Sequence, residues 1–362
     1  MNITKVLPPA PATILERERL ISRLRGWEDK KLVIIHAQAG QGKSTLAAGY
    51  VRSLGSPSVW YNMDQEDDNP AVFLASLGQA VQRAYPGQVP KLPLIPQNRY
   101  GIGGMHQGIT RWVAQVFGNL TPPSLIVFDD YNCVPSPRTV PHLLKTLIET
   151  TPPHVRFMLL SRAQPEIEIA RLRARRDVGE ITGEDLKFSD NEVYDLFVTV
   201  FGMHLAKNEV SLVNRTAEGW AAGLVLMHEF LTAAPPEGRP AALSERKPAG
   251  FQSHVFDYLA QEVFSHLPAG MQDFLLRTSI VDYLPMPLAG LLTGLPTSAA
   301  EGRMTVPAVV EELRKKNLFL TAGNDEEMVV RFHALFRDFL QKTLVARTKP
   351  AEVKRLYTTA AN

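Results

Sequence analysis

Short, mainly apolar runs alternate with helical apolar spacings along the first half of the chain. Four runs read as strands, at residues 32–35, 59–63, 125–128 and 155–160. Runs of this kind, bounded by turn residues, are typical of strands buried on both faces of a parallel sheet. The segments between them carry apolar residues three or four positions apart. The alternation continues to about residue 187 and predicts an α/β fold with a doubly wound parallel sheet.

One segment of this first half lacks either pattern. Residues 85–108 are rich in proline and glycine, and we expect a long loop there, followed by a helix over 109–117. A loop of this length is a candidate lid or partner surface.

The second half of the chain shows helical spacing in place of apolar runs. Ser189 and Glu192 form a capping-box pattern, which predicts the start of a helical stretch that ends near residue 232. Residues 233–250 are rich in proline and small residues and predict a linker. Three helices and a β-hairpin are expected beyond it, at 251–267, 270–278, 307–316 and 318–333. Helices followed by a hairpin predict a winged helix.

The turn after the first strand carries the most specific motif. Residues 37–44 read AQAGQGKS, a Walker A pattern in which Ala37 replaces the usual first glycine. Its backbone N–H groups and the positive N-terminal end of the next helix would attract phosphate. Lys43 would reach the β/γ-phosphates, and the Ser44 hydroxyl would bind Mg²⁺. The phosphate-binding residues expected here are Ala39, Gly40, Gln41, Gly42, Lys43 and Ser44. The alternative is an ordinary strand–turn–helix with a surface lysine.

Polar residues end the next two apolar runs of the sheet. Asp129 and Asp130 follow the run 125–128, at the edge where open α/β sheets bind ligands. Asp129 would hold Mg²⁺, and Asp130 would orient or deprotonate the attacking water. Arg162 follows the run 155–160 and has the charge to sense a γ-phosphate. The alternatives are a strand that simply ends in Asp-Asp and a surface arginine.

Composition limits the function classes. The 362 residues are enough for two or three domains, and the formal net charge of +2 gives no general argument for nucleic-acid or membrane binding. The single cysteine, Cys133, excludes an intramolecular disulfide and fits a reducing compartment. We found no secretory signal, no apolar stretch long enough to span a bilayer and no transition-metal ligand spacing. A cytoplasmic location without membrane attachment is therefore expected.

Seven segments together carry a family resemblance that covers the chain from Arg17 to about Leu344. They are AQAGQGKSTL, LIVFDDY, LLSR, AEGWAAGL, HVFDYLAQEVF, FLLRTSIVDYL and RFHALFRDFL. This set resembles the ATP-binding half of the MalT-like branch of LuxR-type transcriptional regulators. These are large bacterial regulators of the STAND class, the signal-transduction ATPases with numerous domains.

The resemblance implies further nucleotide contacts. It adds Thr45 to the phosphate and Mg²⁺ contacts, and it makes Gly219-Trp220 the turn beside the adenine. His333 would touch the ADP β-phosphate and lock a resting state. From the hairpin alone, His333 would more often be a structural histidine. Arg17 would line the nucleotide pocket.

Five regions are expected along the chain. They are a P-loop NTPase domain over 1–187, a helical domain over 188–232, a linker over 233–250, a winged-helix domain over 251–346, and the start of a C-terminal helical arm or sensor region over 347–362.

The function implied is an ATP/ADP switch within a transcriptional regulator. ADP would favour a closed form through His333, whereas ATP would favour an open form that self-associates, and slow hydrolysis would reset the switch. In full-length relatives a helical-repeat sensor for a small-molecule or protein inducer and a DNA-binding helix-turn-helix follow, and neither lies in these residues. Three alternatives stay open: a constitutive P-loop ATPase, a scaffold that only holds nucleotide, and a DNA-binding protein. The last would act through the winged helix or the basic run 171–176.

Overall fold

The computed structural model describes residues 3–8, 14–89, 101–120, 124–134, 139–233, 249–281, 283–298, 304–315, 320–322 and 330–361. The chain forms two compact units, of which the first contains Met1–Ala37 with Gly42–Leu186 and the second contains Gln38–Gln41 with Lys187–Asn362. The short segment Gln38–Gln41 is the tip of the Walker A turn.

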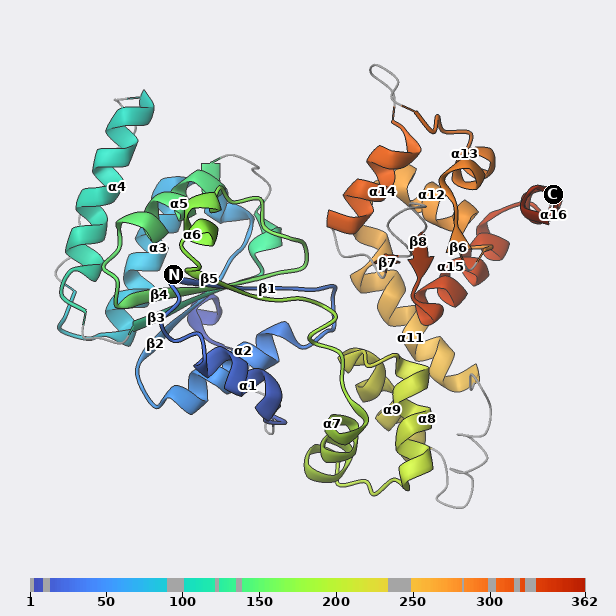
Figure 1. Ribbon diagram of the computed structural model, residues 1–362, viewed down its shortest axis with the longest axis horizontal. Coiled ribbons are helices and arrows are strands. Elements are labelled where there is room, and N and C mark those ends of the chain that lie inside the picture. Colours follow the sequence, from blue (N-terminus) through green and yellow to red (C-terminus); the bar gives the residue numbers. More distant parts are fainter. Residues whose placement is uncertain are drawn as a thin grey trace. The chain divides into compact units, whose positions relative to one another are not determined.

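The first unit is built on a five-stranded, all-parallel sheet of order β2-β3-β4-β1-β5 (Figure 1). Its strands are β1 (Leu32–His36), β2 (Ser58–Asn62), β3 (Ser124–Asp129), β4 (Val155–Ser161) and β5 (Val178–Ile181). Every residue of β1, β3 and β4 is buried, as the apolar runs predicted. Side chains without polar groups can fill both faces of such a strand.

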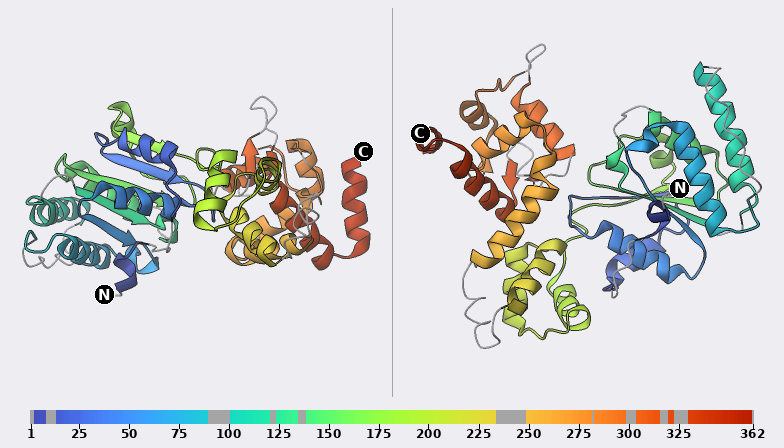
Figure 2. Two further views of the ribbon diagram at one scale, coloured as in Figure 1. Left: turned by 90° about the horizontal axis from the view of Figure 1, so that it is seen from below. Right: turned by 180° about the vertical axis from the view of Figure 1, so that it is seen from behind.

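Helices cover both faces of this sheet, and the right-hand view of Figure 2 shows the same two layers from behind. One core lies under α1 (Glu18–Arg25) and α2 (Lys43–Leu54). The other lies under α3 (Pro70–Ala84), α4 (Gly101–Phe117) and α5 (Thr139–Thr150). The short α6 (Ala170–Ala174) precedes β5. The predicted α/β, doubly wound fold is confirmed.

The predicted loop over 85–108 is wrong in its second part. Helix α4 begins at Gly101, eight residues before the predicted start at Ile109. The glycines at its beginning lower helix propensity but do not prevent a helix whose later turns bury Ile109, Trp112 and Val116. Residues 90–100 of the segment lie outside the described residues.

The N-terminal segment lies along the edge strand β2. The 3₁₀ turn η1 (Ile3–Val6) contacts β2, and the Asn62 side chain donates a hydrogen bond to the Leu7 carbonyl at 3.0 Å. Lys5 is buried and contacts Asp64 at 2.9 Å and Asp67 at 3.0 Å, both in or beside the 3₁₀ turn η2 (Gln65–Asp68) that follows β2. One side of this edge strand is therefore covered by the chain itself.

The second unit begins with a helical part. It contains α7 (Asp190–Asp195), the π-helical turn η4 (Leu196–Val200), α8 (Lys207–Ala217) and α9 (Ala221–Ala233). The predicted capping box is confirmed at the start of α7, where Ser189 and Glu192 exchange hydrogen bonds between side chain and backbone. The predicted linker over 233–250 falls almost wholly outside the described residues.

A winged-helix part follows, with an antiparallel sheet of order β6-β8-β7. Its elements are α11 (Ala249–Glu262), η6 (Phe264–His266), α12 (Ala269–Thr278), β6 (Tyr283–Leu284), α13 (Met286–Thr293), α14 (Val306–Lys315), β7 (Leu320–Ala322), β8 (Val330–Phe332), α15 (Ala334–Arg347) and α16 (Pro350–Ala361). The predicted helices and hairpin are present, and α13 is a further helix between residues 278 and 307, where the sequence predicts none.

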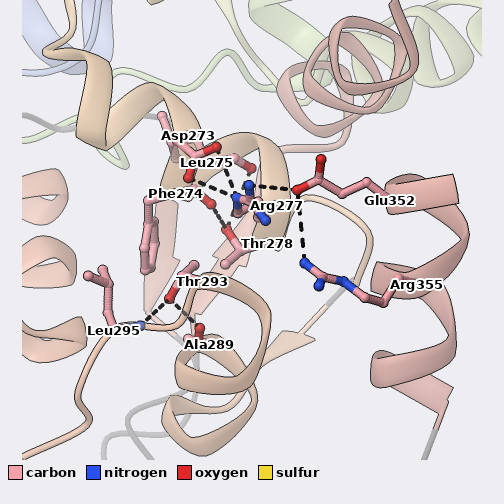
Figure 3. A network of polar contacts seen from close by, with 10 residues as sticks. All are labelled: Asp273, Phe274, Leu275, Arg277, Thr278, Ala289, Thr293, Leu295, Glu352 and Arg355. Carbon is pink, nitrogen blue, oxygen red and sulfur yellow. Dashed lines mark hydrogen bonds and ion pairs between the residues drawn. The ribbon is translucent and has the colours of Figure 1, made fainter. Parts of the chain in front are cut away.

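Helix α16 is held by charged contacts. Figure 3 shows the Arg277 side chain of α12 between Asp273 on its own helix and Glu352 of α16. The guanidinium donates to Asp273 at 2.8 Å and to Glu352 at 2.8 Å.

Of the helices in the part of the chain that the structure describes, none is long and apolar enough to cross a bilayer.

Candidate nucleotide site

The Walker A lysine is the first residue of α2. Gly42 precedes it with φ +81°, a left-handed conformation that glycine adopts without steric cost. The Lys43 side chain is 8% exposed, and its Nζ donates a hydrogen bond to the Ala37 carbonyl at 2.7 Å. This side chain turns back over the loop at the edge of the sheet. The burial contradicts the alternative of a surface lysine.

Ser44 and Asp129 lie together beside this lysine. Asp129 is the last residue of β3 and is 4% exposed, and its carboxylate accepts a hydrogen bond from the Ser44 hydroxyl in the first turn of α2. Burial raises the pKa of Asp129 to about 6, the neighbouring Asp130 charge adds to this, and the Ser44 bond opposes it. A hydroxyl and a buried carboxylate in contact would suit Mg²⁺, which prefers oxygen ligands.

Asp130 differs from Asp129 in position and exposure. Its backbone has φ +55°, a left-handed conformation that is uncommon for residues other than glycine, and its side chain is exposed. The backbone N–H of Asp130 donates to the Asp129 carboxylate at 2.9 Å. This turn directs the second carboxylate away from the first, so one is buried at the sheet edge and the other can reach water.

Arg162 follows β4 directly and is tied to the acidic turn. Its backbone N–H donates to the Asn132 side-chain oxygen at 2.8 Å, and Asn132 lies in the 3₁₀ turn η3 (Tyr131–Cys133) after Asp130. Asn132 was missed by the sequence reasoning. The available signal was its place two residues after the acidic pair, since asparagine side chains commonly bond nearby backbone.

Electrostatics show that four predicted residues form one cluster. The pKa of Lys43 is lowered to about 8, mainly by burial and next by the charge of Arg162, while Asp129 and Asp130 act to raise it. The structure therefore brings together the four residues to which the sequence assigned catalysis. Their chemical roles stay predictions.

Two other predicted residues of the first unit occupy different surroundings. Thr45 is exposed in the first turn of α2. Arg17 is 6% exposed, immediately before α1, and its guanidinium donates to the Leu186 carbonyl at 2.8 Å. Arg17 thus joins the start of α1 to the segment after β5, and its contact with a nucleotide stays a prediction.

The remaining predicted residues lie in the second unit. Gly219 has φ +72° and follows the C-terminus of α8, where Glu218 is the cap. Trp220 is fully buried, and its indole N–H donates to the Ala39 carbonyl in the Walker A turn at 3.1 Å. Gln41, in the same turn, is 3% exposed.

His333 is the residue before α15 and is 7% exposed. Its Nε2 lies 3.5 Å from the Glu218 carboxylate, which also accepts a hydrogen bond from the Ala334 N–H at 3.2 Å. Its ring meets that of Trp220 edge to face, with centroids 6.3 Å apart. Burial lowers the pKa of His333, against the raising effect of Glu218. His333 therefore joins the winged-helix part to the turn at Glu218–Trp220.

Comparisons with known proteins agree with the expected resemblance. Residues 260–353 match the family model of the MalT winged helix domain. The chain is 29% identical over 330 residues to the HTH-type transcriptional regulator MalT of Yersinia enterocolitica, covering 90% of this chain and 35% of that protein. It is 28% identical over 350 residues to the serine/threonine-protein kinase PknK of Mycobacterium tuberculosis, covering 93% of this chain and 30% of that protein. The chain thus spans about a third of the length of these curated relatives.

The fold also matches a solved structure. The Walker-type ATPase paby2304 of Pyrococcus abyssi aligns with 91% of this chain and 96% of its own, with a TM-score of 0.57 and 14% sequence identity. The resemblance to MalT-like regulators, the P-loop NTPase fold and the winged helix are thereby confirmed.

Proposed function

We propose that this chain binds ATP and ADP with Mg²⁺ and acts as the nucleotide-dependent switch of a transcriptional regulator. The observation that carries this proposal is the contact between the Ser44 hydroxyl and the buried Asp129 carboxylate, beside the buried Lys43. In P-loop enzymes a serine or threonine and an aspartate at these two positions hold the metal. The left-handed Gly42 and the helix it precedes support phosphate binding at the same point.

Ser44 and Asp129 would hold the Mg²⁺, which would supply positive charge to neutralise the charge that develops during phosphoryl transfer. The chain's own residues would divide the remaining work. Lys43 would exchange its bond to the Ala37 carbonyl for phosphate oxygens, and the exposed Asp130 would orient or deprotonate water. Arg162, with its backbone held by Asn132, would face the γ-phosphate.

The regulatory part of the proposal rests on His333 and on the relatives. MalT is named as a transcriptional regulator, and the matched winged-helix family bears the same name. His333, held beside Glu218, would contact ADP in a closed form, while ATP would favour an open form that self-associates. An inducer sensor and a DNA-binding domain would lie outside these residues, so DNA binding is assigned to the whole regulator. We propose a cytoplasmic location for it.

Nucleotide binding is tested by calorimetric titration of ADP and ATP, each with Mg²⁺ and with EDTA. We expect Lys43→Ala to abolish binding and Ser44→Ala to remove the Mg²⁺ dependence selectively. Thr343→Ala, a threonine whose hydroxyl bonds the α15 backbone, serves as the control and should bind like the wild type. Equal affinity in Lys43→Ala and the wild type would contradict the proposal.

The catalytic alternative is tested by turnover. A switch should hydrolyse ATP slowly and retain ADP, whereas a constitutive ATPase should turn over rapidly without an inducer. A multiple-turnover phosphate-release assay on the wild type and Asp130→Asn separates the two. Rapid release in the wild type that is lost in Asp130→Asn would favour the constitutive enzyme, and ADP retained on the purified protein without turnover would favour the scaffold.

A further inference from the structure

The tip of the Walker A turn is bonded by the beginning of α9. The indole N–H of Trp220 donates to the Ala39 carbonyl at 3.1 Å, and the backbone N–H of Ala222 donates to the Gly40 carbonyl at 2.9 Å. Both bonds lie within the second unit, to which Gln38–Gln41 belongs. Two consecutive carbonyl groups of the turn are therefore fixed from the same side.

Fixing these carbonyls also fixes the amide donors of the turn. In a trans peptide the C=O of one residue and the N–H of the next point in opposite directions. The bonds to Ala39 and Gly40 therefore direct the N–H groups of Gly40 and Gln41 away from α9. Phosphate binding by a Walker turn requires such N–H groups to point in a common direction.

The packing around Gly40 shows how closely the turn is held. Gly40 has φ +72°, and a Cβ atom there would lie 2.7 Å from the Ala222 Cβ, 2.8 Å from the Tyr258 hydroxyl and 3.0 Å from the Trp220 Nε1. Only glycine fits both the conformation and the space. The turn is thus packed directly on the indole that bonds its carbonyl.

Trp220 itself has no exposed surface with which to meet a ligand. The residue is 0% exposed, and its ring meets Tyr258 with centroids 5.4 Å apart and His333 with centroids 6.3 Å apart, both edge to face. The ring is held by the helical and winged-helix parts while its N–H reaches the Walker turn. Because the ring is fully buried, we expect Trp220 to hold the Walker A turn and not to stack on the adenine base.

We infer that Trp220 is a positioning residue, which orients the phosphate-binding amides of Gly40 and Gln41 through the Ala39 carbonyl. The inference deepens the proposed nucleotide binding and rests on it for its ligand, the diphosphate portion of ADP or ATP. It assigns to Trp220 a contact with the loop, in place of the adenine contact that the family resemblance implies.

The matched variants are Trp220→Phe and Trp60→Phe. Both replace a buried indole by a phenyl ring and remove one hydrogen bond. Trp60 donates to the Asn62 side chain at 2.8 Å, on β2. Ala222→Pro is the second variant, because proline is tolerated in the first turn of a helix and removes the N–H that bonds the Gly40 carbonyl.

The first readout is binding of ADP and of inorganic pyrophosphate, which has phosphates but no base. Loss of one neutral hydrogen bond should weaken both by about two- to tenfold in Trp220→Phe, and Ala222→Pro should act in the same direction. Trp60→Phe should bind both like the wild type. Weaker ADP binding with unchanged pyrophosphate binding would overturn the inference, because it would indicate contact with the base. Unchanged binding of both probes would overturn it as well.

The second readout is hydrogen–deuterium exchange in the nucleotide-free, full-length chain. Exchange of the Ala222 amide and of peptides that contain residues 38–42 should become faster in Trp220→Phe and stay unchanged in Trp60→Phe. A wild type that binds neither ADP nor pyrophosphate would contradict the proposed function. Hydrogen–deuterium exchange would then still test whether Trp220 holds the Walker A turn. Unchanged exchange in Trp220→Phe would overturn the inference, also if the variant binds nucleotide less tightly.

Discussion

Asp129→Asn should stabilise the nucleotide-free protein while it removes the proposed metal ligand. Asp129 is 4% exposed, and its pKa is raised from 3.8 to about 6, with burial as the largest cause. A raised pKa means that folding disfavours the charged form of this carboxyl group. Asparagine keeps the shape, carries no charge and can still accept the Asp130 N–H. A functional group that lowers the stability of the folded protein is common at functional sites, where activity and stability compete.

The size of the effect follows from the pKa shift. A shift of about two units corresponds to about 3 kcal/mol between the two protonation states. The folded-state pKa is higher than the unfolded-state pKa. The contribution of the protonated Asp129 to stability is therefore fully present below pH 4 and is lost as the pH rises through about 6. We therefore expect Asp129→Asn to raise the free energy of unfolding by up to about 3 kcal/mol at pH 8. The gain should fade as the pH falls towards 4.

The assay is calorimetric unfolding with EDTA at pH 8 and pH 5, in wild type and variant. Asp67→Asn is the control, because Asp67 is fully buried but its charge is compensated. Its carboxylate contacts Lys5 at 3.0 Å and accepts a hydrogen bond from the Tyr61 hydroxyl at 2.6 Å. Removing this charge should lower stability. If Asp129→Asn lowers stability at pH 8 as Asp67→Asn does, the reasoning is refuted.

Three further outcomes are expected. Gly42→Ala, at φ +81°, should cost about 1–2 kcal/mol of stability and weaken ADP binding; unchanged unfolding would contradict this. Glu218→Gln replaces the charged acceptor of the Ala334 N–H at the start of α15 and should lower the free energy of unfolding of the second unit by about 0.5–1 kcal/mol. The same thermogram as wild type would argue against it. Arg277→Ala should release α16 by breaking the bond to Glu352. The loss of stability should be no more than about 1 kcal/mol, because the pair is partly exposed. Limited proteolysis should then cut after residue 347 more rapidly than in the wild type, and equal cleavage rates would refute this prediction.

The sequence predicts those parts of the fold whose pattern has one physical interpretation. An apolar run such as 125–128 can be buried on both faces only in the middle of a sheet, and β3 lies there. The pair Gly42–Lys43 marks a left-handed turn before a helix, and the structure has this turn. Helix α4 was predicted too short because glycines 101, 103 and 104 lower helix propensity locally, whereas tertiary packing of the later turns determines the helix.

The parts of the site that were missed depend on contacts between distant residues. Trp220 and Ala39 are 181 positions apart, and neither carries a local signal that they share a hydrogen bond. The same holds for Glu218 and Ala334, which are 116 positions apart. Motifs indicated which residues belong to the site, but only the folded chain shows how their side chains are supported.

The N-terminal cover of β2 has a consequence for solubility. An uncovered edge strand presents unpaired N–H and C=O groups that can pair with another chain and start aggregation. Lys5 holds η1 beside β2 through Asp64 and Asp67, and Asn62 bonds the Leu7 carbonyl. Residues 3–8 therefore cover part of this edge strand and would hinder its pairing with a strand of another chain. A chain shortened by these residues would have an edge open to its own copies.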